Sequence, residues 1–137
     1  MWHYLRRRSS IIRNESRSNG VAFLFITHDM AVAKVVSDRI AVMYLGKVVE
    51  VGPGDSIVQD PLHPYTKAML QASPVIDASQ KNEVLKVNII GELPKSTAHP
   101  PGCKFHPRCP YAMDVCKREE PALKEVKPDH LVACWLY

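Results

Sequence analysis

The chain has 137 residues, 46% of them hydrophobic, and a formal net charge of +4 at pH 7. This length allows one domain with a hydrophobic core, or parts of two. Residues 1–18 hold five arginines against Glu15, so the rest of the chain is balanced in charge. A nucleic-acid-binding domain needs a basic face within its folded part, and we therefore expect no nucleic-acid partner.

No apolar run approaches the roughly 18 residues needed to span a bilayer, so we expect no transmembrane segment. The basic N-terminus is followed by polar residues 9–20 and not by the apolar core of a signal peptide. The sequence therefore predicts an intracellular protein, in which cysteines are more often metal ligands than disulfides. Residues 1–20 show no periodicity, and we assign them no role.

An unbroken apolar run over residues 21–27 predicts a strand buried on both faces. It ends in Thr27-His28-Asp29, and open α/β sheets bind ligands at the carboxyl ends of such strands. His28 is therefore a candidate ligand-binding residue. The segment alone gives equal weight to an alternative, in which these polar residues only cap the next helix.

The pattern after this strand predicts a helix over residues 30–37 and a second apolar strand over residues 40–45. Asp29 is the expected N-cap of that helix. Gly46-Lys47 predicts a hairpin turn of type II′ into a strand over residues 48–51. The order strand, helix, strand, hairpin is typical of an α/β fold.

Two further helices and one strand are expected before residue 91. Asp55 is the predicted cap of a short helix that ends at Gln59. Pro64 suits the first turn of the next helix, which Ser73-Pro74 ends. Residues 84–90 are apolar enough to form a strand.

All four cysteines follow residue 91, where prolines also become frequent. They are Cys103, Cys109, Cys116 and Cys134. No two of them have the separation of two to four residues that is usual in structural zinc sites. Loosely spaced thiolates can surround a larger group, which favours a [4Fe–4S] cluster over zinc. His106 and His130 lie among the cysteines as candidate zinc ligands or supporting residues. Four thiols without a metal are the remaining alternative.

Three motifs in this order resemble a known family. Residues 25–29 (Phe-Ile-Thr-His-Asp) and residues 37–50 resemble the switch-histidine loop and the following strands of an ABC-transporter ATPase domain. Residues 60–66 (Asp-Pro-Leu-His-Pro-Tyr-Thr) are similar to the His-Pro-Tyr signature of oligopeptide and dipeptide importers. Residues 102–134 resemble the cysteine-bearing C-terminal extension of these importers. The likeness covers residues 21–137.

The resemblance implies three parts. Residues 1–20 are an unmatched basic segment. Residues 21–90 are the C-terminal part of an α/β ABC ATPase domain, including the His-Pro-Tyr segment. Residues 91–137 are a small loop-rich extension that carries the cysteines.

The resemblance also implies roles, cofactors and partners. His28 would contact the γ-phosphate of ATP and help to position the attacking water, and the four cysteines would hold a [4Fe–4S] cluster. ATP and magnesium belong to the intact family protein. Its partners are membrane permease subunits, a second ATPase subunit and, indirectly, an extracytoplasmic peptide-binding protein. Such a protein lies peripherally at the cytoplasmic face of the membrane and energises uptake of dipeptides, oligopeptides or, in some members, nickel.

Several parts of a complete ATPase are missing from the sequence. It has no phosphate-binding loop of the form G-x-x-x-x-G-K-[ST], no Leu-Ser-Gly-Gly-Gln signature and no catalytic glutamate before His28. We therefore expect a truncated product or an excised fragment that does not hydrolyse ATP alone. A stand-alone iron–sulfur or zinc-binding module is the alternative function.

Overall fold

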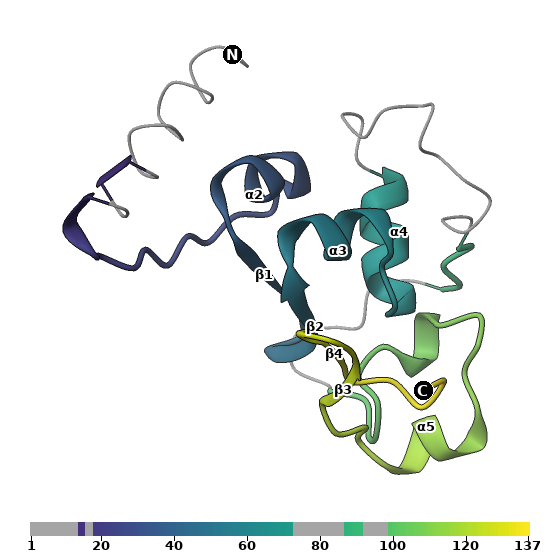
Figure 1. The fold of residues 1–137 in the computed structure, drawn as a ribbon. Coiled ribbons are helices and arrows are strands. Elements are labelled where there is room, and N and C mark those ends of the chain that lie inside the picture. The colour runs from purple at the N-terminus through teal and green to yellow at the C-terminus, as the bar shows by residue number, and fades with distance from the viewer. Residues whose placement is uncertain (1–13, 16–17, 73–86, 92–98) are drawn as a thin grey trace.

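A computed structural model describes residues 14–15, 18–72, 87–91 and 99–137. In chain order the elements are α2 (Met30–Val36), β1 (Arg39–Tyr44), β2 (Lys47–Pro53), α3 (Gly54–Gln59), α4 (Pro64–Ala72), the 3₁₀ helix η3 (His106–Arg108), α5 (Asp114–Arg118), β3 (Lys124–Lys127) and β4 (His130–Val132). Helices α2, α3 and α4 gather at one end, and α5 lies at the other (Figure 1). The fold is mixed α/β, as the sequence predicted. In the described ranges, no helix is long and apolar enough to cross a membrane.

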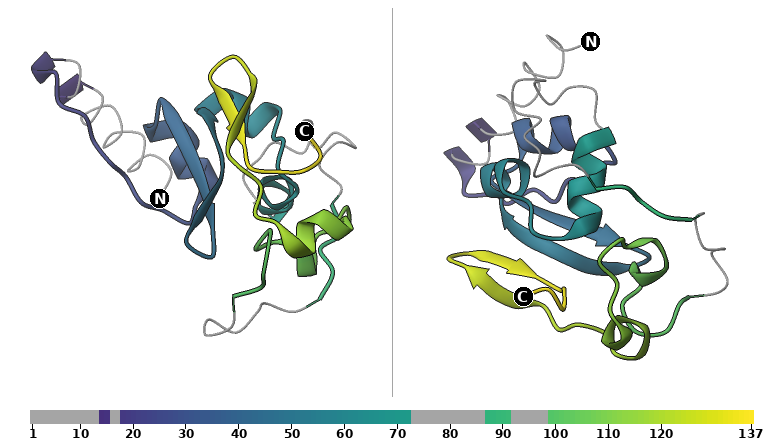
Figure 2. Two further views of the ribbon diagram at one scale, coloured as in Figure 1. Left: turned by 90° about the horizontal axis from the view of Figure 1, so that it is seen from below. Right: turned by 90° about the vertical axis from the view of Figure 1, so that its right-hand side faces the viewer.

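The sheet is built from two distant parts of the chain. Its strand order is β1-β2-β4-β3, and all neighbouring strands are antiparallel. Strand β4 pairs with β2 so that Glu50 lies opposite Val132 and Val51 opposite Leu131. The C-terminal hairpin lies along β2 (Figure 2). The tail that follows residue 91 therefore completes the sheet that β1 and β2 begin.

The turn between β1 and β2 differs from the predicted type II′ turn at Gly46-Lys47. Leu45 and Gly46 form the two-residue loop, with φ values of 45° and 77°. Two positive φ angles are the requirement of a type I′ turn, whose twist matches that of the flanking strands. The hairpin itself was predicted correctly, but its turn lies one residue earlier.

The helix starts follow local chemistry. The Asp29 carboxylate accepts hydrogen bonds from the N–H groups of Ala31 (2.8 Å) and Val32 (3.2 Å), which confirms Asp29 as the N-cap of α2. Helix α4 begins at Pro64, also as predicted. The expected capping role of Asp55 is wrong: this residue lies inside the first turn of α3, which begins at Gly54.

The predicted strand over residues 21–27 is absent from the described sheet. A strand needs a hydrogen-bonding neighbour, and apolar side chains need a layer to cover them. Leu24 is 92% exposed and Ile26 is 89% exposed, so no described layer covers this segment. It leads away from the remainder of the fold (Figure 1). The strand predicted over residues 84–90 lies partly outside the described residues, and residues 87–90 are not in a strand.

The hydrophobic core includes one large side chain from the cysteine tail. Phe105 is 1% exposed and belongs to the same buried cluster as Ile57 of α3 and Leu70 of α4. Its ring lies 5.2 Å from that of Tyr44 in an edge-to-face arrangement and 5.4 Å from that of Tyr65. Aromatic pairs of this kind add about 0.5–1.5 kcal/mol beyond the burial of their area. The tail is therefore anchored in the core.

We expect Gly102→Ala to destabilise the chain because Gly102 has φ +62° and a Cβ there would lie 2.4 Å from the carbonyl oxygen of Cys116. The cost should exceed the 1–2 kcal/mol or so that a left-handed conformation alone imposes on alanine. Gly46→Ala is the matched control, since Gly46 has φ +77° with open space around it. Urea unfolding of both variants measures the difference, and equal losses would contradict the steric explanation.

Candidate functional site

The four cysteine side chains come from separate elements of the tail. Cys103 precedes η3, Cys109 follows it, Cys116 lies in α5, and Cys134 follows β4. All four are free thiols. The N–H of Cys103 donates to the carbonyl oxygen of Cys116 at 2.8 Å, which holds the first cysteine loop against α5.

The four thiols lie close enough to influence one another. Burial raises the pKa of Cys134 to about 11, and the charges of the other three cysteines add to that rise. Burial likewise raises the pKa of Cys109, with smaller contributions from Cys103 and Cys116. Like charges interact in this way only at short range, so the fold brings the thiols to one region.

Backbone N–H groups near three of these sulfurs partly oppose the effect of burial. Burial raises the pKa of Cys103, Cys109 and Cys134, and the N–H groups of Phe105 and His106, of Tyr111 and of Leu136, respectively, offset part of that rise. The sulfur of Cys116 accepts a hydrogen bond from the N–H of Met113 at 3.4 Å. Because the net shift at the first three thiols is upward, the thiol is favoured over the thiolate, and a metal bound there would have to displace the protons.

The tail histidines do not complete a site for one metal ion. Across the described parts of the chain, no three His, Cys, Asp or Glu side chains are grouped so that they could hold an ion. Nδ1 of His106 lies 2.9 Å from the carbonyl oxygen of Cys103, so this ring packs beside a cysteine loop. Nε2 of His130 lies 2.7 Å from a carboxylate oxygen of Glu50.

Glu50 forms a buried hub that the sequence analysis missed. Its side chain is 0% exposed. One oxygen accepts hydrogen bonds from the N–H of Leu62 (2.7 Å) and from Nε2 of His130 (2.7 Å), and the other accepts from the N–H of His63 (3.0 Å). Because a carboxylate only accepts, Nε2 carries the proton of this contact. A glutamate between the valines of an apolar strand was the signal that could have identified it.

The His-Pro-Tyr segment is held by contacts of its own. Nδ1 of His63 accepts a hydrogen bond from the N–H of Tyr65 at 3.0 Å. His63 is 1% exposed, and burial, followed by the charge of Lys67, lowers its pKa to about 4. The imidazole is therefore neutral at pH 7, and its ring lies 5.7 Å from that of Phe105.

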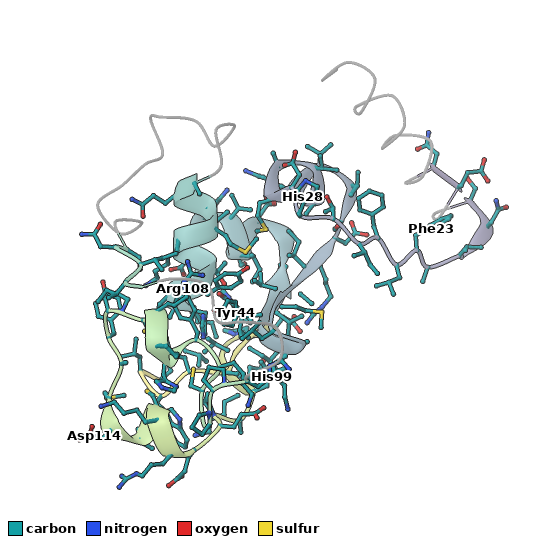
Figure 3. All side chains as sticks on the ribbon, turned by 180° about the vertical axis from the view of Figure 1, so that it is seen from behind. Phe23, His28, Tyr44, His99, Arg108 and Asp114 are labelled. Carbon is teal, nitrogen blue, oxygen red and sulfur yellow. The ribbon has the colours of Figure 1, made fainter. Side chains whose placement is uncertain are left out.

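His28 lies apart from the cysteine tail. It is exposed and stands just before α2. Thr27 accepts a hydrogen bond from the N–H of Asp29 at 3.0 Å, and Asp29 caps α2, so these two neighbours of His28 have local structural roles. Figure 3 shows His28 in the upper middle of the view and Asp114, the first residue of α5, at the lower left, well separated from it.

Comparison with known proteins places this arrangement in a family. Residues 49–116 match the family model described as the C-terminal region of oligopeptide/dipeptide transporters. The matched segment runs from β2 to α5 and contains the His-Pro-Tyr motif and three of the four cysteines. Residues 49–116 therefore belong to the C-terminal region of the oligopeptide/dipeptide transporter family.

The relatives are ATP-binding proteins. The putative oligopeptide transport ATP-binding protein YkfD of Bacillus subtilis is 41% identical over 128 residues, which are 93% of this chain and 39% of YkfD. The oligopeptide transport ATP-binding protein AppF of the same organism is 44% identical over 85% of this chain and 36% of AppF. A probable peptide ABC transporter ATP-binding protein of Sinorhizobium fredii is 42% identical over 91% of this chain and 35% of its own length.

The chain spans less than two-fifths of the length of these relatives. It corresponds to a C-terminal fragment of such ATP-binding proteins. The recognition of this family from the His28, His-Pro-Tyr and cysteine motifs is therefore confirmed.

We expect the free energy of unfolding to fall by about 3 kcal/mol between pH 7 and pH 4 because of His63, at about 1.4 kcal/mol per pKa unit. The pKa of His63 is lowered in the folded chain from 6.5 to about 4. Its contribution is therefore complete above pH 6.5 and is lost as the pH falls toward 4. Urea unfolding of the wild type and of His63→Gln across this range measures it.

The variant His99→Gln, which changes an exposed histidine, is the control and should follow the wild-type profile. If His63→Gln and the wild type lost the same free energy between pH 7 and pH 4, the buried neutral state of His63 would be refuted.

Proposed function

We propose that this chain serves as the C-terminal part of the ATP-binding subunit of a peptide-importing ABC transporter. The observation that carries the proposal is the alignment of 85–93% of the chain with ATP-binding proteins named for oligopeptide or peptide transport. In that role it takes part in energising uptake of dipeptides or oligopeptides at the cytoplasmic face of the membrane. Its partners are permease subunits, a second ATPase subunit and, indirectly, an extracytoplasmic peptide-binding protein.

The division of labour along the chain is part of this proposal. Residues 21–90 contribute to the ATPase domain, residues 91–137 form the cysteine-bearing extension, and residues 1–20 have no assigned role. The family match runs from residue 49 through residue 91 to residue 116, and the sheet also joins the two sides, so the proposed boundary near residue 91 is a change of composition only.

His28 is the proposed catalytic residue. An exposed imidazole before the first turn of α2 is free to approach a phosphate that another part of the ATPase holds. Such a group can stabilise charge that develops on the γ-phosphate and can orient the attacking water. ATP and magnesium would be bound by the parts of the relatives that lie outside this chain.

The four cysteines Cys103, Cys109, Cys116 and Cys134 are the proposed ligands of a [4Fe–4S] cluster, with zinc as the alternative. The donor set fits a thiolate-bound group in kind, because the charges of the other three thiols raise the pKa of Cys134 and those of Cys103 and Cys116 raise that of Cys109, in both cases after burial. Four loosely spaced cysteines suit a multinuclear cluster better than a single ion. When bound, such a cluster would supply redox or structural chemistry, and the N–H of Met113 beside the Cys116 sulfur would tune it.

Anaerobic purification tests this site. With a cluster bound, we expect a brown protein with about four iron and four sulfide per chain, as the composition of a [4Fe–4S] centre requires. Cys116→Ser should lower the content severalfold, because Cys116 is the most buried of the four thiols. His99→Gln, which changes an exposed histidine outside the cysteine loops, is the matched control. A colourless protein with one zinc would favour zinc, and a metal-free protein would refute both.

A chimera tests the role in ATP hydrolysis. Residues 21–137 replace the matching C-terminal part of YkfD, which then supplies the remaining ATPase. We expect the chimera to hydrolyse ATP, and His28→Ala to lower kcat by about 10²-fold or more, as is typical for loss of a catalytic acid–base or charge-stabilising group. His99→Ala, at an exposed histidine of the tail, is the control and should leave kcat unchanged.

Equilibrium dialysis of the chain alone completes this experiment. Without a phosphate-binding loop it should bind ATP too weakly to detect. An inactive chimera, or tight ATP binding by the chain alone, would contradict the proposed function. An inactive chimera that still loads iron and sulfide would instead support the stand-alone metal-binding module, whose ligands all lie in residues 103–134.

A further inference from the structure

We propose that the cysteine site and the His-Pro-Tyr segment form one mechanical unit, in which metal loading of the cysteines orders residues 61–65. The inference rests on the proposed metal site, and it adds a function to that site. Two chains of contacts connect the cysteines to this segment. One begins at Cys134 and the other at Cys103, and both end at the segment around Leu62 and His63.

The first route leaves Cys134 through β4. Ala133, next to this cysteine, donates its N–H to the carbonyl oxygen of Val49 at 2.8 Å. Four residues before Cys134, the His130 ring reaches the buried Glu50 carboxylate. That carboxylate accepts the N–H groups of Leu62 and His63, so a displacement of β4 acts directly on the loop.

The His130 ring has little freedom in this position. It is 2% exposed, and a Cβ on Gly52 would lie 3.1 Å from its Cδ2 atom. The ring therefore lies directly against the backbone of β2. The His130 ring, the Glu50 carboxylate and the loop N–H groups are all buried. If they separated, buried polar groups would lose their hydrogen-bond partners, so we expect them to move together.

Tyr137 provides a second connection between Cys134 and Leu62. Its N–H donates to the carbonyl oxygen of Cys134 at 3.4 Å, and its hydroxyl donates to the carbonyl oxygen of Leu62 at 3.3 Å. Leu62 is thus held through its N–H by Glu50 and through its carbonyl by Tyr137. Tyr137 lies three residues after Cys134, and His130, which contacts Glu50, lies four residues before it.

The second route leaves Cys103. Two residues later, Phe105 enters the core, where its ring lies 5.7 Å from that of His63 and 5.4 Å from that of Tyr65. Only Lys104 separates Cys103 from Phe105, so the sulfur position and the ring position are linked through a short stretch of backbone. A group that fixes Cys103 and Cys134 together therefore clamps the His-Pro-Tyr segment from both sides.

Hydrogen exchange of the full chain, followed by mass spectrometry, tests the coupling. Apo chain is compared with chain loaded anaerobically with iron and sulfide. We expect loading to slow exchange of the Leu62 and His63 amides by about tenfold, which corresponds to about 1.4 kcal/mol of additional protection. Amides of α2, which is remote from the tail, serve as the internal control.

Variants of His130 test the first route without relying on metal. His130→Leu removes the donor to Glu50, and His130→Gln retains an N–H donor at nearly the same place. In the apo chain we expect the Leu62 and His63 amides to exchange severalfold faster in His130→Leu than in His130→Gln. Tyr137→Phe, at a partly exposed ring, provides a second variant should His130→Leu fail to fold, and it should loosen the Leu62 region.

The outcomes separate this inference from the proposed metal site. Metal bound without any change at Leu62 and His63 overturns the coupling and leaves the metal site standing. No metal bound overturns both. Equal apo exchange in His130→Leu, His130→Gln and Tyr137→Phe overturns the route through Glu50 and Tyr137, whatever the metal content.

Discussion

The buried carboxylate of Glu50 holds together parts of the chain that are far apart in sequence. It lies on β2, accepts two N–H groups from the segment that precedes α4, and accepts a third hydrogen bond from His130 on β4. A carboxylate in such a site is expensive unless its acceptor positions are filled, so each of the three partners depends on the other two. The four-stranded sheet, the start of α4 and the C-terminal hairpin consequently form a single unit around one side chain.

Because of these contacts, the tail after residue 91 is part of the same fold as the preceding strands and helices and is not a separate appendage. Composition places a boundary near residue 91, where prolines and cysteines begin. Across that boundary, however, β4 pairs with β2, Phe105 fills the core beside Tyr44 and Tyr65, and the Tyr137 hydroxyl contacts Leu62. The cysteine loops are attached to this framework at Cys103 and Cys134. A metal centre on such loops would be connected to β2 and to the start of α4 through packed side chains.

Local chemistry in the sequence predicted the local elements well. Asp29 as a cap, Pro64 as a helix start and the hairpin of β1 and β2 depend on a few neighbouring residues, and the structure has all three. A strand over residues 21–27 would need neighbouring strands, and the described sheet does not provide them. An apolar pattern in the sequence does not reveal whether such neighbours are present. Glu50 and the pairing of β2 with β4 depend on contacts 80 residues apart, which no local pattern encodes. The cysteines were recognisable by type, whereas the burial that raises the pKa of Cys103, Cys109 and Cys134 comes from the conformation of their loops.

The exposure of Leu24 and Ile26 has a consequence for the fate of the chain in a cell. Exposed apolar side chains in an irregular segment are the kind of site that chaperones bind and that proteases cleave. The β3 edge of the sheet is different, because it presents Lys124 and Lys127, charges that discourage pairing between molecules. The sheet is thus protected against association along β3, whereas residues 21–26 stay accessible to such factors as long as no further layer covers them.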